Sequence, residues 1–159
     1  MSFSASPPQD DPASQHLMPT ATHPTEAFAK SVSNGRAFDA PSICLLDDDL
    51  SMLKALDRLL KSDGFNVEKF SDPAAFLSSI GEATCRLAIL DVWMPDMNGL
   101  EVQTCLRRDS PETRIIFITG RDDPLIHQTA LEAGAFGFLS KPFEDETLVQ
   151  LIHKANGSE

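Results

Sequence analysis

The stretch "LAILDVWMPDMNG", Leu87–Gly99, decides the fold of this chain. It begins with four apolar residues, which predict a short buried strand, and Asp91 follows at the end of that strand. The continuous apolar character is typical of a strand covered on both faces, as in a parallel sheet. An ionised carboxylate at the edge of a core is costly unless a positive charge or hydrogen-bond donors meet it. Asp91 therefore requires partners from other parts of the chain.

Strand-like and helix-like segments alternate on both sides of this stretch. Apolar or alternating runs predict strands at residues 42–46, 66–70, 87–90, 114–118 and 137–139. Helices are expected after each of them, at about 50–63, 73–80, 99–108, 124–134 and 144–155. Five β–α units in sequence predict an α/β fold, with a doubly wound, five-stranded parallel sheet and helices on both faces. Because parallel strands point the same way, the residues that follow them gather at one edge.

Polar residues mark where the helices begin and end. Asp49 and Asn98 are expected to cap the first and third helices, and Ser71 is expected to cap the second. Gly64 is the expected stop signal of the first helix.

Composition excludes several classes of protein. A net charge of −11 over 159 residues argues against nucleic-acid binding by this chain itself, because phosphate contacts need clustered lysine and arginine. No apolar run approaches the roughly 18 residues of a membrane helix, and the N-terminus lacks the features of a secretory signal. We therefore expect a cytoplasmic protein with no membrane partner. The three cysteines form no CxxC motif and are expected to be reduced thiols.

The N-terminal region differs in composition from the rest of the chain. Residues 1–41 hold six of the eleven prolines and many serines and threonines, without a helical or strand period. We expect a disordered N-terminal tail there, acting as a spacer. One folded domain is expected over residues 42–155, followed by a short C-terminal tail at 156–159.

Acidic, hydroxyl and ammonium side chains follow the predicted strands. Asp47 and Asp48 follow the first strand, Asp91 ends the third, Thr119 follows the fourth and Lys141 follows the fifth. If the first and third strands are neighbours, the carboxylates converge and their repulsion raises their pKa values. A hard divalent cation removes this conflict, and carboxylate and carbonyl oxygens are the ligands that Mg²⁺ prefers.

Such a cluster suits the transfer of a phosphoryl group onto a carboxylate. Asp91 is the predicted nucleophile, and it needs no general base because a carboxylate is already ionised at neutral pH. The metal and Lys141 would offset charge on the phosphoryl oxygens, and Thr119 would hydrogen-bond to one of them.

Four stretches carry a resemblance to a known family: "CLLDDDLSML", "LAILDVWMPDMNGLEV", "IIFITGRDD" and "GAFGFLSKPF". In this order and at this spacing, they make residues 42–155 resemble the receiver domain of bacterial two-component response regulators. Each stretch alone is a weak signal, because an acidic pair after a strand is common, whereas all four together are specific. The resemblance implies a flavodoxin-like fold with strand order 2-1-3-4-5.

The resemblance also implies roles for the residues at the sheet edge. It makes Asp91 the residue that is phosphorylated, with Lys141 as the family's lysine. It implies that Asp48, Asp91 and the main-chain carbonyl of Trp93 bind Mg²⁺ directly, while Asp47 acts largely through water.

The same resemblance implies a conformational switch made of Thr119 and Phe138. Phosphorylation is expected to draw Thr119 toward the phosphoryl group, which leaves space for Phe138 to turn inward. This change biases the face formed by the fourth helix, fifth strand and fifth helix, where partners dock and two copies can pair. The donor is expected to be a phosphohistidine on a sensor histidine kinase or a phosphotransfer protein.

By this interpretation the chain is a signalling switch and not an enzyme. Up to Glu159 the sequence holds no helix-turn-helix, catalytic module or basic region. A single-domain regulator and a receiver from a longer protein both fit this observation.

Two other functions remain as alternatives. A magnesium-dependent phosphohydrolase with an aspartyl nucleophile, of the haloacid-dehalogenase type, needs a second aspartate two residues after the first, where this chain has Trp93. A pseudo-receiver that binds partners without phosphorylation would not need the intact set of acidic, hydroxyl and lysine side chains.

Two further expectations concern residues near the site. Trp93 and Arg121 each stand two residues beyond a predicted site residue, and we hypothesise that they shield an aspartyl phosphate from water. The four histidines share no metal-ligand spacing, so we expect solvated positions for them.

Overall fold

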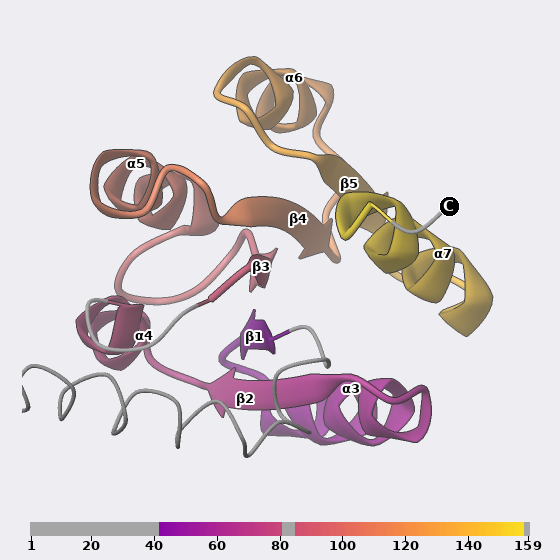
Figure 1. Ribbon diagram of the computed structural model, residues 1–159. Helices are drawn as coiled ribbons and strands as arrows, with labels where there is room; N and C mark the ends of the chain where they lie inside the picture. The colour runs from indigo at the N-terminus through magenta and orange to yellow at the C-terminus, as the bar shows by residue number, and fades with distance from the viewer. Residues whose placement is uncertain (1–41, 81–84, 158–159) are drawn as a thin grey trace, which may run out of the picture. The chain divides into compact units, whose positions relative to one another are not determined.

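The computed structural model describes residues 42–80 and 85–157, in which five strands and five helices alternate (Figure 1). The predicted tail at residues 1–41 and the last two residues, 158–159, lie outside the described part. The strands are β1 (Ser42–Leu46), β2 (Asn66–Phe70), β3 (Leu87–Asp91), β4 (Arg114–Thr119) and β5 (Gly137–Ser140). The helices are α3 (Leu50–Ser62), α4 (Pro73–Ile80), α5 (Gly99–Asp109), α6 (Pro124–Glu132) and α7 (Asp145–Ala155).

The five strands form one parallel sheet in the order β2-β1-β3-β4-β5, so the predicted doubly wound, flavodoxin-like α/β fold is confirmed. β1 and β3 pair directly, with Leu46 beside Leu90. The chain winds outward from this pair in both directions, which makes the β1–β3 boundary the switch point of the sheet. The residues after β1 and β3 therefore meet at the position where folds of this kind bind their ligands.

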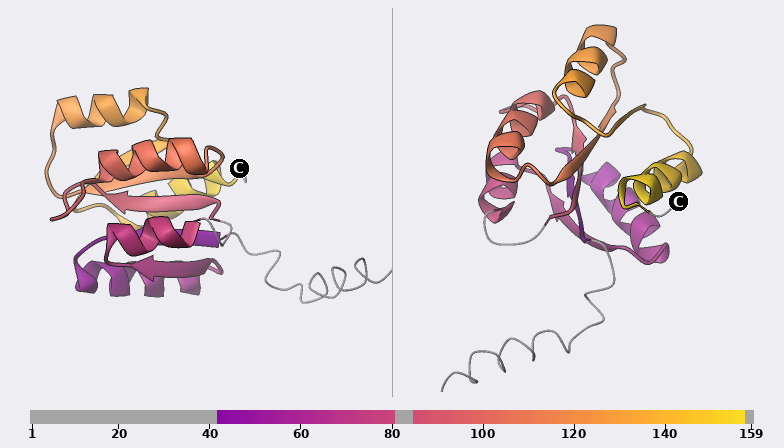
Figure 2. Two further views of the ribbon diagram at one scale, coloured as in Figure 1. Left: turned by 90° about the vertical axis from the view of Figure 1, so that its left-hand side faces the viewer. Right: turned by 45° about the horizontal axis from the view of Figure 1, so that its top comes forward.

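Helices cover both faces of the sheet (Figures 1 and 2). α3 and α7 bury apolar side chains on one face, and α4, α5 and α6 bury theirs on the other. The predicted apolar stripe of α3 is buried as expected; its members are Leu53, Leu56 and Leu60. Burial of apolar surface on both faces is the main stabilising term for such a sheet. Within the two described ranges, no helix combines the length and the hydropathy needed to span a bilayer.

The helix starts agree with two of the three predicted caps. The Asp49 side chain accepts hydrogen bonds from the first turn of α3. Asn98 forms a capping box with Glu101 at the start of α5. The prediction of Ser71 as the cap of α4 was wrong, because the carboxylate of Asp72 accepts the hydrogen bond from the first turn instead.

Candidate functional site

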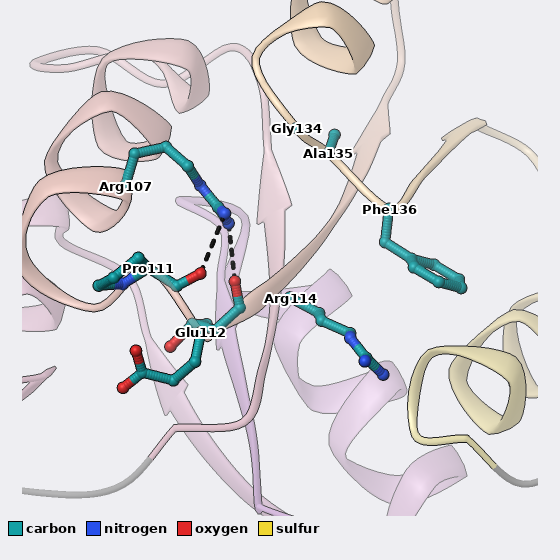
Figure 3. Close-up of a pocket in the computed structure, with 8 residues that line it drawn as sticks. Arg107, Pro111, Glu112, Arg114, Gly134, Ala135 and Phe136 are labelled. Atoms are coloured by element: carbon teal, nitrogen blue, oxygen red, sulfur yellow. Dashed lines mark hydrogen bonds between the residues drawn. The ribbon is translucent and has the colours of Figure 1, made fainter.

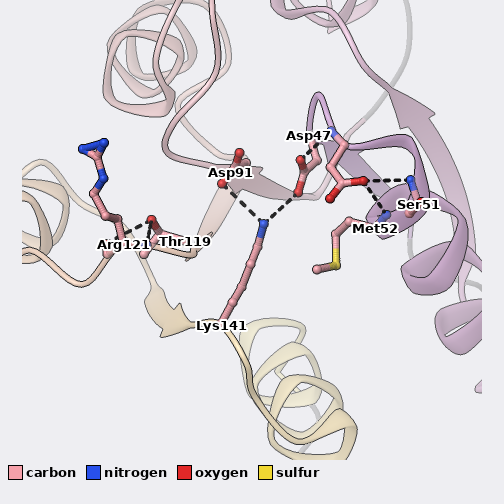
Figure 4. A network of polar contacts seen from close by, with 8 residues as sticks. Asp47, Ser51, Met52, Asp91, Thr119, Arg121 and Lys141 are labelled. Carbon is pink, nitrogen blue, oxygen red and sulfur yellow. Dashed lines mark hydrogen bonds and ion pairs between the residues drawn. The ribbon is translucent and has the colours of Figure 1, made fainter.

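The predicted site residues meet at the carboxyl edge of the sheet (Figure 4). Asp47 follows β1, Asp91 is the last residue of β3, Thr119 is the last residue of β4, and Lys141 follows β5. Asp47, Asp91 and Thr119 are buried, with exposed fractions of 2%, 5% and 0%. The strand register produces this convergence, because the parallel strands β1, β3, β4 and β5 all end on the same side.

Three carboxylates form a cluster that fits a metal ion. Oxygen atoms of Asp47, Asp48 and Asp91 lie within 4.8 Å of one another, and the Asp48 side chain is exposed to solvent. Burial and the neighbouring charges of Asp47 and Asp48 raise the pKa of Asp91 to about 6, against a lowering by Lys141. The expected rise in pKa is therefore present at Asp91. Carboxylates that repel one another in a half-open edge are suitable ligands for a hard divalent cation.

Lys141 bridges two of these carboxylates. Its ammonium group donates a hydrogen bond to the Asp47 carboxylate at 3.2 Å and lies 3.7 Å from an Asp91 oxygen. The peptide bond between Lys141 and Pro142 is cis. One positive charge is thus shared between two buried negative charges, and the cluster keeps a net negative charge that a cation can neutralise.

Asp47 is held in place by its own loop and by the end of β2. Its second carboxylate oxygen accepts the backbone N–H of Asp49 at 2.9 Å, and its own N–H donates to the carbonyl of Phe70. These contacts fix the carboxylate toward the site, independently of Lys141.

The hydroxyl of Thr119 contacts the backbone of Arg121 and not Asp91. The Arg121 N–H donates to the Thr119 hydroxyl at 3.1 Å, and the hydroxyl lies 3.2 Å from the Arg121 carbonyl (Figure 4). The hydroxyl has a single proton to donate, so it must release the Arg121 carbonyl before it can donate a hydrogen bond to a group on Asp91.

Trp93 and Arg121 are in contact beside the site. The guanidinium carbon of Arg121 lies 4.4 Å from the centre of the Trp93 ring, in a cation–π arrangement. The two residues come from the loops after β3 and β4, so the pair bridges the loops that carry Asp91 and Thr119. The sequence placed both residues near the site, but it gave no signal that they touch.

Phe138 is partly buried on β5 and lies against His127 of α6. Their rings stack with centres 4.4 Å apart and an interplanar angle of 8°. The expectation of a solvated position was therefore wrong for His127, which is half-buried because its ring packs flat on Phe138.

Gly99 contributes to the site through its lack of a side chain, a role the sequence analysis missed. A Cβ atom there would lie 2.6 Å from the carbonyl oxygen of Asp91 and 2.9 Å from the Phe117 ring. The N–H of Gly99 donates to the Val92 carbonyl at 2.8 Å. The start of α5 thus packs directly on the backbone of Asp91, which only glycine permits.

A separate hollow lies at the opposite edge of the sheet, around the start of β4 (Figure 3). There Arg107 donates hydrogen bonds to the carbonyls of Pro111 and Thr113. Arg114 donates to the Ala155 carbonyl at the end of α7 and lies over the Phe136 ring. Both guanidinium groups therefore hold loops and a helix end in place.

The fold and the site together define a class of protein: a doubly wound α/β domain with an acidic cluster and a lysine at the carboxyl edge, beside the switch point. The chain belongs to the response regulator receiver domain family, which matches residues 43–153. The resemblance seen in the sequence is confirmed.

Individual relatives agree with this family. The response regulator protein TodT of Pseudomonas putida is 42% identical over 116 residues, which cover 73% of this chain and 51% of TodT. The transcriptional regulatory protein FixJ of Bradyrhizobium diazoefficiens is 35% identical over 113 residues, covering 71% of this chain and 55% of FixJ. The chain thus spans about half the length of these curated relatives.

Solved structures show the same likeness. The chemotaxis protein CheY4 of Vibrio cholerae superposes with a TM-score of 0.69 at 30% identity, covering 73% of this chain and 98% of CheY4. A CheY-like receiver domain protein from Methanospirillum hungatei gives a TM-score of 0.71 at 26% identity, covering 76% of this chain and 97% of that one.

Proposed function

We propose that residues 42–155 form a receiver domain that accepts a phosphoryl group on Asp91 from a phosphohistidine of a sensor histidine kinase or phosphotransfer protein. The observation that supports this most directly is the position of Lys141, whose ammonium group lies between the carboxylates of Asp47 and Asp91. In this function the chain is a signalling switch and catalyses no turnover of a separate substrate.

The reaction requires a nucleophile and a way to offset charge. An Asp91 carboxylate oxygen forms the new P–O bond while the P–N bond of the donor breaks. The ammonium group of Lys141 is 3.7 Å from Asp91, within reach of a phosphoryl oxygen attached there. The Asp91 side chain is almost buried, so these charges act where water screens them weakly.

The acidic cluster supports magnesium as the cofactor. Asp48, Asp91 and the main-chain carbonyl of Trp93 would hold the ion directly, and Asp47 largely through water. When bound, Mg²⁺ neutralises the carboxylates and the phosphoryl oxygens.

Thr119 and Phe138 transmit the change in this proposal. Thr119 leaves the backbone of Arg121 to hydrogen-bond a phosphoryl oxygen, and Phe138 turns toward the space that it vacates. Phe117, Thr119 and Phe138 lie on the same face of the sheet, because alternate strand residues share a face and Phe117 pairs with Phe138. The affected surface is formed by α6, β5 and α7, where we expect a protein partner or a second copy to bind.

The test is incubation of the whole chain with acetyl phosphate, followed by intact-mass measurement. We expect one labile phosphoryl group in the presence of Mg²⁺ and none in excess EDTA, and borohydride trapping should locate it at Asp91. Steady release of product from a phosphate ester, without a trapped group, would instead indicate the phosphohydrolase. If the chain neither takes up a phosphoryl group nor turns over the ester, the result favours the non-phosphorylated binding module.

The contact between Trp93 and Arg121 predicts that the phosphoryl group on Asp91 lasts longer in the parent than in a variant that lacks this contact. A ring and a guanidinium group packed together beside Asp91 restrict the approach of an attacking water molecule. In Trp93→Ala we expect the phosphoryl group to be lost faster by roughly threefold to tenfold, the range set by losing an exposed cation–π pair and the water exclusion it provides. The measurement is the decay of the phosphorylated form after removal of acetyl phosphate.

Arg121→Ala tests whether the pair acts together. We compare each single variant with the double variant that carries both Trp93→Ala and Arg121→Ala. If the contact provides the shielding, the phosphorylated form of the double variant should decay no faster than that of the faster single variant. Leu125→Ala, which changes an exposed residue in the first turn of α6, serves as the matched control. A decay rate unchanged by Trp93→Ala would end the shielding hypothesis.

A further inference from the structure

Phe138 is held between two rings in this structure. His127 stacks flat on it from α6 with ring centres 4.4 Å apart, and the Phe117 ring lies tilted against it at 6.0 Å. A side-chain rotation between staggered rotamers moves a phenyl ring by several ångströms. Phe138 therefore cannot turn toward Thr119 and keep the stack with His127 unless α6 moves with it.

α6 is anchored by few contacts, so its position is easily changed. Ala130 is the single buried residue of this nine-residue helix. The buried Gln103 side chain of α5 donates a hydrogen bond to the Ala130 carbonyl at 3.1 Å. The stack between His127 and Phe138 is the aromatic contact that α6 makes with the edge strand β5. Ile126 is partly buried and packs against the core on the same face. A helix held by so few packed side chains resists a shift only weakly.

Thr119 is linked to His127 through the loop between β4 and α6. Its hydroxyl contacts the Arg121 backbone, and Arg121 stands three residues before Pro124, the first residue of α6. His127 lies in the first turn of α6, where its N–H donates to the carbonyl of the N-cap residue Asp123. A movement of Thr119 is thus passed through one short loop to the helical turn that carries His127.

We propose that His127 is a positioning residue that holds Phe138 in the unphosphorylated orientation and sets the threshold of the switch. This proposal rests on the proposed function, because it assumes that Phe138 turns inward when Asp91 is modified. In the unphosphorylated state the ring stack stabilises the orientation of Phe138 seen in this structure, with its ring against His127, which we call the outward state. Release of the Arg121 backbone by Thr119 frees the start of α6, so that the stack opens and Phe138 can turn.

The proposal predicts the direction of a mutational effect. His127→Ala removes a contact made only in the outward state, so the protein shifts toward the inward state before any ligand binds. Its affinity for a phosphoryl mimic at Asp91 should rise by roughly twofold to tenfold, the range of a single aromatic pair. His127→Phe keeps a flat ring and should restore the parental affinity.

The experiment is a titration of the whole chain with beryllofluoride in the presence of Mg²⁺. Trp93 is the one tryptophan of the chain and lies beside the site, so its fluorescence reports binding. Thr129→Ala, an exposed change in the same helix, is the matched control and should bind with the parental affinity. His127→Gln is a second ring-free variant, and circular dichroism checks that each variant is folded. In a Phe138→Leu background, His127→Ala should have no effect.

The outcomes separate this proposal from the proposed function. Tighter binding by both ring-free variants, with rescue by His127→Phe, supports it. The proposal is overturned if folded His127→Ala and His127→Gln bind beryllofluoride with parental or weaker affinity. It is also overturned if the affinity of His127→Phe or of Thr129→Ala rises as much as that of His127→Ala. If the parent binds no beryllofluoride and acetyl phosphate modifies no residue, the proposed function fails, and this proposal fails with it.

Discussion

Replacing Asp91 with asparagine is expected to abolish phosphorylation and at the same time to stabilise the fold. In magnesium-free buffer at pH 7 we expect the free energy of unfolding to rise by about 3 kcal/mol, because the pKa of Asp91 is displaced by about two units. The cause is that the folded protein holds Asp91 beside Asp47 and Asp48 in a largely buried position, which makes its ionisation unfavourable. Asparagine keeps the shape of the side chain and removes this charge.

The pH dependence follows from the direction of the shift. The pKa of Asp91 is about 6 in the folded chain and about 4 when unfolded, so between these values the folded state binds more protons. Stability of the parent should therefore fall as the pH rises from about 4 to about 6 and then stay lowered. The difference between Asp91→Asn and the parent should be small near pH 4 and reach its full size above pH 6.

Urea unfolding over this pH range measures the effect. Asp96→Asn, an exposed change in the loop after β3, is the matched control and should alter the free energy of unfolding by less than about 0.5 kcal/mol. Added Mg²⁺ should stabilise the parent more than Asp91→Asn, because binding to the folded state alone raises stability by mass action. A parent that is as stable as Asp91→Asn at pH 7 without magnesium would contradict the picture of a strained acidic cluster.

The sequence predicts those features that depend on order along the chain. Alternating apolar strands and helices give the five β–α units, and a parallel sheet then brings Asp47, Asp91, Thr119 and Lys141 to one edge without any knowledge of distances. The cap at Asn98 follows from local hydrogen-bond chemistry, which needs no tertiary information.

The sequence does not predict features that depend on packing between distant segments. His127 reads as an ordinary helix residue, and only the position of β5 against α6 shows that its ring covers Phe138. Trp93 and Arg121 are 28 positions apart, and no local pattern specifies that a guanidinium group stacks on that ring. The cap of α4 shows a smaller failure, because Ser71 and Asp72 are both good cap residues and backbone geometry selects Asp72.

Gly99→Ala is expected to destabilise the chain by about 3 kcal/mol, the upper end of the usual cost of overpacking a core. The added methyl group would lie 2.6 Å from the Asp91 carbonyl oxygen, 2.9 Å from the Phe117 ring and 3.0 Å from the Cα atom of Val92. Two of these three neighbours are backbone atoms, which cannot rotate away as a flexible side chain could. α5 must therefore move outward, which weakens the hydrogen bond from Gly99 to Val92 and displaces Asp91.

Gly120→Ala is the matched control for this prediction. A Cβ atom at Gly120 would meet only the Lys141 side chain at 3.9 Å, an ordinary van der Waals contact, so its free energy of unfolding should stay within about 0.5 kcal/mol of the parent. Urea unfolding of both variants at pH 7 gives the comparison. In folded Gly99→Ala the rate of phosphorylation by acetyl phosphate should also fall, because the same contact sets the position of the Asp91 backbone. Equal stability of the two alanine variants would show that α5 can move away from β3 at no cost, and that the close approach at Gly99 does not position Asp91.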